Sequence, residues 1–140
     1  MRVLVLAVGR QKDDLWTEAE AEYRKRLPRY ADVDVRSVKD EKALLAALPA
    51  RARLVVLDER GDLLSSDELA RAVIGRAQLD AVDLVFAIGG PEGHSEEVRR
   101  RAWRKVAFGR ITLPHRMCRV LLLEQIYRGF TSLKGEPYHK

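Results

Sequence analysis

The sequence predicts an α/β fold with a mostly parallel β-sheet flanked by helices. Two patterns carry this prediction. Short apolar runs rich in β-branched residues are nearly continuous, which is typical of strands buried on both faces of a sheet. Segments with helical periodicity separate these runs, and regular alternation of strands and helices favours parallel strands. The expected strands are residues 3–8, 33–38, 54–57, 84–88 and 111–113.

The first expected helix has an apolar stripe with four-residue spacing at Leu15, Ala19, Tyr23 and Leu27, and Pro28 limits its end. Leucines 44, 45 and 48 indicate a short second helix. Ser65 and Glu68 form a capping box that opens the third.

Ser95 is expected to cap a fourth helix, whose apolar members are Val98, Ala102, Trp103 and Val106. The fifth is the longest and is expected over 116–133. The 140 residues contain no internal repeat and no Pro/Gly/Ser-rich linker, so we expect one domain over 1–140.

The composition excludes several classes of protein. With 46% hydrophobic and 34% charged residues, the chain is neither collagenous nor wholly disordered. A lone cysteine, Cys118, excludes an internal disulfide, and no apolar run approaches the length that crosses a membrane. The six apolar residues before Gly9 are interpreted as a strand and not as a signal peptide, so we expect a reducing cytoplasm.

Charge is distributed unevenly along the chain. Residues 1–97 hold 15 Lys and Arg against 19 Asp and Glu, whereas residues 98–140 hold 11 against 2. A basic end of this strength indicates either an anionic partner such as nucleic acid or a solvated basic face.

Ligands of open parallel sheets bind beyond the carboxyl ends of the strands, which draws attention to residues 58–64, 89–95 and 114–118. Glycine occupies three of the five positions 89–93, so this loop is either a ligand cradle or an ordinary tight turn. It matches neither the Rossmann fingerprint nor the P-loop. The acidic pair Asp58 and Glu59 either faces a ligand or ends a strand in solvent.

The remaining chemistry-bearing residues leave further alternatives open. The histidines and the cysteine lack the spacing of a zinc site, so we expect no metal. Cys118 is interpreted as a buried, inert thiol. Glu124 and Arg128 share a helix face and form either a surface ion pair or a functional polar cluster. At the end of the chain, Tyr138 and His139 are suited to stacking on an unpaired base, and Lys140 to a phosphate.

Three motifs together resemble the ribosomal large-subunit pseudouridine methyltransferase H family of the SPOUT superfamily. They are the segment 88–93, the set Leu113-Pro114-His115 with Arg119, Glu124, Tyr127 and Arg128, and the closing segment 137–140. The resemblance covers essentially the whole chain. It implies S-adenosylmethionine as methyl donor, and N3 of a pseudouridine in helix 69 of 23S ribosomal RNA, on assembled ribosomes, as acceptor. It also implies a homodimer and a C-terminal trefoil knot.

The resemblance also assigns site residues by position. The donor side comprises Leu57, Gly89, Gly90, Gly109, Arg110, Ile111, Thr112, Leu113 and Pro114. The acceptor side comprises Glu124, Arg128, Tyr138 and His139, with Lys140 beside them. No motif covers His94, which is given no role.

The reaction implied is direct displacement, in which the ring nitrogen attacks the methyl group in line. Either Glu124 or His139 accepts the N3 proton, and Arg128 stabilises the developing ring anion. The basic run over 99–105 contacts phosphates in part, and the tail is expected to order against a partner subunit or RNA. The alternatives are a non-catalytic α/β RNA-binding module and a small-molecule enzyme that binds a nucleotide on the glycine-rich loop.

Overall fold

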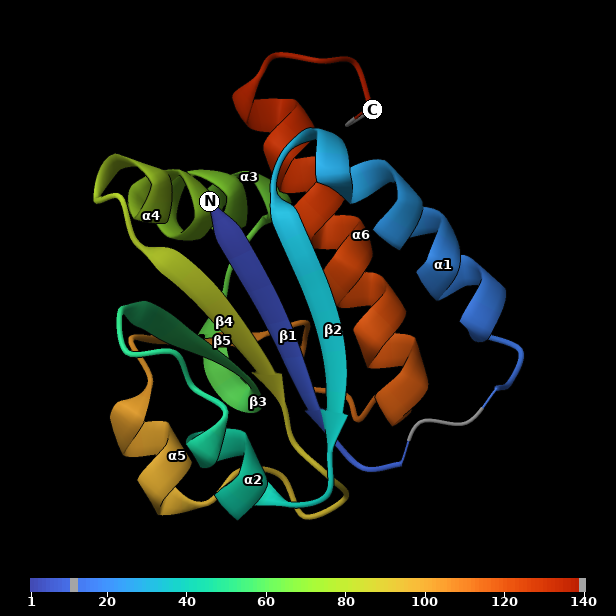
Figure 1. Cartoon of the computed structure of the whole chain (residues 1–140), viewed down its shortest axis with the longest axis vertical. Helices are drawn as coiled ribbons and strands as arrows, with labels where there is room; N and C mark the ends of the chain where they lie inside the picture. Colours follow the sequence, from blue (N-terminus) through green and yellow to red (C-terminus); the bar gives the residue numbers. More distant parts are fainter. Residues whose placement is uncertain (11–12, 139–140) are drawn as a thin grey trace.

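One five-stranded sheet organises the computed structural model, which describes residues 1–10 and 13–138. The strands lie in the order β2-β1-β4-β3-β5, and every neighbouring pair is parallel. The predicted fold class is therefore confirmed (Figure 1), whereas the knot stays a prediction. The strands are β1 (Arg2–Val8), β2 (Asp32–Val38), β3 (Ala52–Leu63), β4 (Asp83–Ile88) and β5 (Arg104–Ala107).

Helices cover both faces of the sheet (Figure 1). One face carries α1 (Thr17–Arg26), α3 (Ser66–Glu68), α4 (Arg76–Leu79) and α6 (His115–Leu133), and a π-helical segment, Leu69–Gly75, joins α3 to α4. The other face carries α2 (Glu41–Ala46) and α5 (Glu96–Arg101).

Alternation along β1 explains the two layers. Val3 and Val5 pack into the core under α6, whereas Leu4 and Leu6 pack into the core under α2 and α5. All four are at most 1% exposed, as the continuous apolar run predicts for a strand buried on both faces. The central strands therefore provide a rigid base from which loops emerge at the carboxyl edge.

The expected helix caps are present. The Ser65 hydroxyl accepts a hydrogen bond from the Glu68 amide at 3.0 Å, and the Glu68 carboxylate accepts one from the Ser65 amide at 2.9 Å. Ser95 caps α5 through the Val98 amide, at 3.3 Å. These bonds satisfy amides that have no partner in the first helical turn.

Two predicted elements are wrong. The fourth helix ends at Arg101, and the backbone of Ala102 is extended. The Trp103 amide then donates to the Leu54 carbonyl at 2.7 Å, so Val106 belongs to a strand and not to a helix. This strand, β5, replaces the one expected at 111–113, where Ile111 is 72% exposed.

Two smaller expectations are corrected as well. Leu15 precedes α1 and is exposed, so it takes no part in the apolar face of that helix. The segment expected to be a loop after residue 57 continues β3 to Leu63, with a break in its register against β5 between Leu57 and Asp62. A Cβ atom at Gly61 would lie 2.7 Å from the Lys105 backbone, so only glycine allows these strands to approach so closely.

A buried ion-pair network fixes α6 against α1 and β2. Arg119 is 1% exposed, and Glu20 is 4% exposed. The Arg119 guanidinium donates to Glu20 Oε2 at 3.2 Å and to the Ser37 hydroxyl at 3.0 Å. Its Nε lies 3.0 Å from Glu20 Oε1 but out of hydrogen-bonding alignment. Arg116 donates to the same carboxylate at 3.1 Å, so two cations from α6 share one anion from α1.

Candidate functional site

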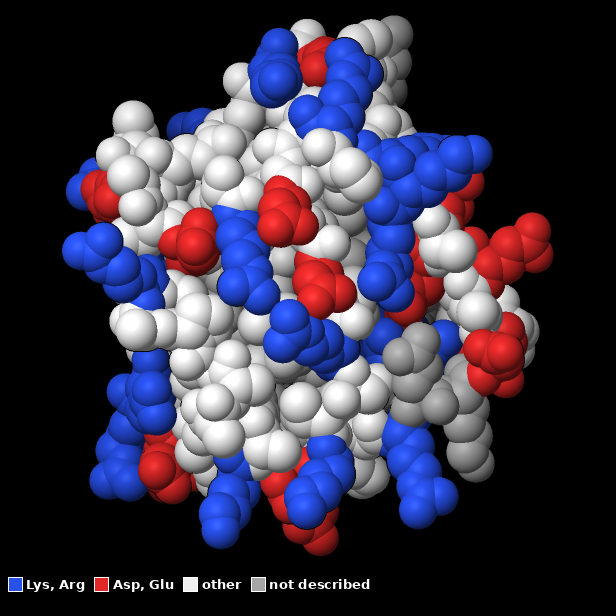
Figure 2. Space-filling model, in the orientation of Figure 1, with Lys and Arg blue, Asp and Glu red and all other residues white. Residues whose placement is uncertain are grey.

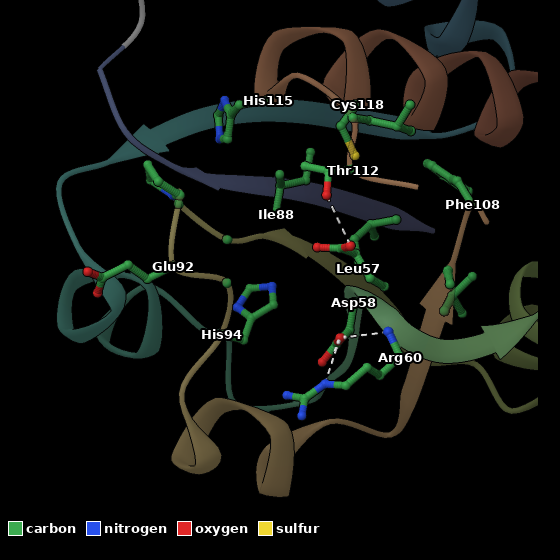
Figure 3. A pocket seen from close by; sticks show the side chains of 18 of the residues that line it. Leu57, Asp58, Arg60, Ile88, Glu92, His94, Phe108, Thr112, His115 and Cys118 are labelled. Atoms are coloured by element: carbon green, nitrogen blue, oxygen red, sulfur yellow. Dashed lines mark hydrogen bonds and ion pairs between the residues drawn. The ribbon is translucent and has the colours of Figure 1, made fainter. Parts of the chain in front are cut away.

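A cavity of about 630 Å³ lies at the carboxyl edge of the sheet, between the ends of β3, β4 and β5 and the start of α6 (Figure 3). This volume is in the range of pockets that hold small molecules. Its wall is formed by Leu57, Asp58, Glu59, Arg60, Ile88, Gly89, Gly90, Pro91, Glu92, Gly93, His94, Arg99, Val106, Ala107, Phe108, Gly109, Ile111, Thr112, Leu113, His115 and Cys118.

Most residues assigned to the donor side lie in this wall. They are Leu57, Gly89, Gly90, Gly109, Ile111, Thr112 and Leu113. Two other residues assigned to the donor side are not part of the wall but adjoin it in the chain. Arg110 donates to the carbonyls of Glu59 and Gly61, and Pro114 is the N-cap of α6. The structure thus brings together, in one cavity, loops separated by more than fifty positions of sequence.

The glycine-rich loop forms one side of the cavity and is closed by its own backbone. The Gly93 amide donates to the Gly90 carbonyl at 2.9 Å. A Cβ atom at Gly89 would lie 2.9 Å from the Gly93 carbonyl carbon, so a side chain at Gly89 would force the turn open. The loop therefore offers backbone, without side chains from its glycines, to whatever occupies the cavity.

An ion pair forms the floor of the cavity near its β3 side. Asp58 accepts from the Arg60 amide at 2.9 Å and from Arg99 Nε at 2.8 Å. Burial raises the pKa of the Asp58 carboxyl, but the bonds from Arg60 and Arg99 outweigh this effect, and the pKa is lowered overall. Asp58 thus lies in the cavity as a paired carboxylate, and its side chain is 9% exposed.

Two histidines line the cavity, and sequence reasoning gave neither a role of its own. His115 is the first residue of α6. Burial lowers the pKa of its imidazole, and the charges of Arg119 and Arg116 lower it further, whereas a hydrogen bond to the Val8 backbone has the opposite effect. Its Nε2 is buried and has no hydrogen-bond partner among the described residues. His94 is 5% exposed, and both of its ring nitrogens contact oxygen atoms.

Cys118 lies on the cavity wall and is a poor nucleophile. Burial raises the pKa of its thiol to about 11. We expect its alkylation by iodoacetamide at about pH 8 to be more than ~100-fold slower than that of a free thiol, because only the thiolate reacts. A mass-spectrometric time course measures this rate, with the same protein unfolded in guanidinium as the control. A native rate equal to the unfolded rate would contradict the prediction.

The residues assigned to the acceptor side form a second cluster, on the outer half of α6. Arg128 Nη2 donates to Glu124 Oε2 at 2.7 Å, and the Tyr138 hydroxyl donates to the same oxygen at 2.9 Å. The Arg128 guanidinium also lies 5.0 Å from the centre of the Tyr138 ring. The ion pair expected between Glu124 and Arg128 is therefore present, with an aromatic residue of the tail added to it.

This cluster keeps its carboxylate charged. Burial raises the pKa of Glu124, but the hydrogen bonds from Arg128 and Tyr138 prevail and lower it overall. The Glu124 carboxylate in turn raises the pKa of Arg128. The pKa of the Tyr138 phenol is raised by burial first, then by its bonds to Tyr23 and Glu124. At neutral pH the cluster holds one anion, one cation and a neutral phenol.

The tail docks within its own chain up to Tyr138. Its hydroxyl lies 3.3 Å from the Tyr23 hydroxyl, and its ring meets the Tyr127 ring edge-on at 4.7 Å between centroids. Tyr138 thus packs against α1 and α6 of its own chain, and ordering of the tail against a partner subunit or RNA stays a prediction. His139 and Lys140 lie outside the described residues.

The two clusters are separated along α6. Cys118 lines the cavity, whereas Glu124 and Arg128 lie six and ten residues further on. At 1.5 Å per residue these positions are about 9 Å and about 15 Å along the helix axis. The acceptor cluster is therefore not part of the cavity wall of its own chain.

The basic residues of α5 and β5 differ in whether they form ion pairs. Arg99 pairs with Asp58, and Arg104 lies 3.7 Å from Asp62. Within the described part of the chain, Arg100, Arg101 and Lys105 have no ion pair, and all three are exposed. Figure 2 shows several basic side chains at the lower left, where Figure 1 places α5, with acidic surface among them. The run spans a helix end and an edge strand, and not one helix as expected.

Two kinds of feature are absent from residues 1–10 and 13–138. No helix there is both long and apolar enough to span a bilayer. No group of three or more His, Cys, Asp or Glu side chains is placed to hold a metal ion.

Comparison with known proteins gives consistent matches over the whole chain. The family model described as a predicted SPOUT methyltransferase matches residues 1–139. Curated proteins named ribosomal RNA large subunit methyltransferase H are similar at 41% identity in Geotalea daltonii and at 40% in Geotalea uraniireducens. Each alignment covers 99% of this chain and 99% of the relative.

Solved structures resemble the fold at much lower identity. A probable methylase family protein from Haemophilus influenzae has a TM-score of 0.59 at 12% identity, over 99% of this chain and 70% of that one. A protein described for the 2-OH methylation of C/U34 on tRNA has a TM-score of 0.52 at 17% identity, over 96% and 97%. These similarities concern the arrangement of helices and strands alone.

Proposed function

The chain belongs to the SPOUT methyltransferases, in the family of the ribosomal RNA large subunit methyltransferases H, and on that premise we propose that it methylates ribosomal RNA with S-adenosylmethionine as donor. The observation that carries the proposal is the cavity at the carboxyl edge of the sheet, because its wall contains most of the residues that the family resemblance assigns to the donor. We further propose that the acceptor is N3 of a pseudouridine in helix 69 of 23S ribosomal RNA on assembled ribosomes, in the cytoplasm.

The cavity fits such a donor on its own features. S-adenosylmethionine, when bound, supplies a methyl group already activated on a sulfonium. Leu57, Ile88 and Leu113 offer apolar surface to a purine, and the loop at 89–93 offers backbone for close approach. The Asp58 carboxylate is placed to accept hydrogen bonds from a hydroxyl or an amine. No metal is needed for this displacement, since holding nitrogen and methyl in near-attack geometry supplies most of the rate.

The cluster on the outer half of α6 is proposed to hold the acceptor base. Arg128 places a cation where negative charge develops as the ring loses its N3 proton. Glu124 is a charged carboxylate beside it and accepts that proton; His139 is the alternative acceptor. Tyr138 and His139 stack on the base, and Lys140 meets a phosphate.

The active unit is proposed to be a homodimer. The acceptor cluster lies outside the cavity wall of its own chain, and Arg128 is about 15 Å further along α6 than Cys118. A second copy can supply the acceptor cluster to the cavity of the first. Apolar side chains left exposed near the cavity and on α6 are available for such a contact: Leu63, Ile111 and Leu121.

Methyl transfer from labelled S-adenosylmethionine to ribosomes from cells lacking this activity tests the proposal. The control is Gly90→Trp, which places a bulky side chain in the cavity wall, with thermal unfolding to show that the variant folds. We expect label on a single large-subunit pseudouridine with the wild type and none with the control. A folded wild type that labels neither intact ribosomes, separated subunits nor extracted RNA would favour the non-catalytic RNA-binding alternative.

Removal of the unpaired basic side chains next to the cavity is expected to weaken RNA binding. The variant Arg100→Ala/Arg101→Ala/Lys105→Ala should raise the KM for ribosomes by about tenfold, and the dependence of log K on log salt should become shallower by about two. Steady-state kinetics at several salt concentrations measure both. The matched control, Lys25→Ala/Arg71→Ala/Arg76→Ala, removes equal charge from the opposite layer. Equal effects of the two variants would contradict a localised RNA surface.

A further inference from the structure

His94 is held between two hydrogen-bond acceptors. Its Nδ1 lies 3.2 Å from Glu41 Oε1 at the start of α2, and its Nε2 lies 3.2 Å from the Ala87 carbonyl oxygen in β4. The imidazole side chain is 1% exposed, so water does not replace either contact. Both oxygens can only accept hydrogen bonds when Glu41 is a carboxylate, and the pKa of Glu41 is lowered overall, against the effect of its burial.

Only the imidazolium ion satisfies both contacts. It carries an N–H on each nitrogen, whereas the neutral ring carries one and leaves a lone pair on the other. In one neutral tautomer this lone pair faces the Glu41 carboxylate; in the other it faces the Ala87 carbonyl. Loss of the second proton therefore replaces one hydrogen bond by a repulsive contact between buried acceptors.

These contacts fix both ends of the glycine-rich loop. Ala87 lies two residues before Gly89, and the Ser95 amide donates to both oxygens of Glu41, at 2.9 and 3.0 Å. His94 thus connects Ala87, in the strand before the loop, with the Glu41 carboxylate, which also binds the Ser95 amide after the loop. The loop between them forms one side of the cavity (Figure 3).

We propose that His94 is a positioning residue of the donor cavity: by donating hydrogen bonds to both Glu41 and the Ala87 carbonyl, its ring holds the loop at 89–93 in its binding shape. This inference rests on the proposed function, since it takes the cavity to be the donor site.

The other charged groups around the ring do not replace this role. Across the cavity, Asp58 of β3 is paired with Arg99 of α5, so their charges largely offset each other. The Glu92 carboxylate of the same loop points away from the ring (Figure 3). His115, on the far side, has a lowered pKa and stays neutral near pH 7. Glu41 is thus the partner of His94 on α2.

Calorimetric titration with S-adenosylmethionine tests the proposal in the wild type, His94→Leu, His94→Gln and Glu41→Gln, with thermal unfolding to show that each variant folds. We expect His94→Leu to raise the Kd about fivefold, because leucine makes neither hydrogen bond, and His94→Gln to recover part of the loss, because its amide group can donate. Glu41→Gln should raise the Kd as well, because it removes the carboxylate that binds both His94 and the Ser95 amide.

A second measurement observes the ring directly. Nitrogen NMR of the free protein should show hydrogen bonds from both His94 nitrogens, and Glu41→Gln should weaken the one from Nδ1. Unchanged donor affinity in a folded His94→Leu variant would overturn the inference while leaving the donor assignment intact. Absence of donor binding by the folded wild type would instead overturn the proposed function, and this inference with it.

Discussion

Replacement of Arg128 by alanine is expected to lower the rate of methyl transfer by about 100-fold or more, with the Kd for S-adenosylmethionine changed less than about twofold. Removing one group that stabilises developing charge typically costs this much in rate. Donor affinity is spared because Arg128 is not part of the cavity wall and is proposed to act on the acceptor base. The loss should appear in kcat and not in donor binding. Single-turnover transfer to ribosomes and calorimetry measure the two quantities.

The control for this substitution is Arg71→Ala. Arg71 also forms an ion pair one helical turn away, with Asp67 at 2.5 Å, but it is exposed on α3 and its π-helical extension, remote from the tail. Its loss should leave methyl transfer within about twofold of the wild type, as expected for a surface pair. Full activity of Arg128→Ala would remove the acceptor role from this cluster. A collapse of donor affinity in the same variant would place Arg128 with the donor.

Replacement of Glu20 by alanine is expected to destabilise the protein by about 3–5 kcal/mol. The substitution leaves the Arg119 guanidinium buried with the Ser37 hydroxyl as its remaining hydrogen-bond partner among the described residues. A buried charge without its counter-ion costs far more than the loss of an exposed pair. Urea unfolding followed by circular dichroism measures the free energy of unfolding.

The neighbouring Glu22 provides the control. It pairs with Arg26 at 3.0 Å, also one turn away on α1, but both side chains are substantially exposed. Glu22→Ala should cost less than about 1 kcal/mol. The double variant Glu20→Ala/Arg119→Met should recover much of the loss, because it removes the unpaired charge. A cost below about 1 kcal/mol for Glu20→Ala would show that the network adds little to stability.

The sequence predicted the central sheet correctly for a physical reason. Strands buried on both faces must be apolar at nearly every position, so β1 and β4 can be recognised in the sequence as continuous apolar runs. The edge strand β5 has one side exposed, and its charged residues Arg104 and Lys105 resemble the end of a helix. The pairing of Trp103 with Leu54 cannot be predicted from residues 101–107 alone, because Leu54 is distant in the sequence.

The candidate site was predicted in two different ways. The position of parallel strands drew attention to the loops at their carboxyl ends, and the glycine spacing to 89–93; the cavity lies there, and the ligand stays a prediction. The role of the segment 109–114 came from family resemblance, because its apolar residues 111–113 had indicated a strand. His94 was missed because its significance depends on Glu41, which lies 53 residues earlier in the chain.

The wall of the cavity has a consequence for the order of folding. Its segments come from residues 57–60, 88–94, 106–109 and 111–118, and the last of these follows β5, which pairs with β3 at the edge of the sheet. Parallel strands joined through helices depend on contacts distant in sequence, which form slowly. A nascent or refolding chain should therefore gain its affinity for the donor late, after the central strands have assembled. Donor binding thus reports completion of the fold, and the ligand stabilises only chains that have reached it.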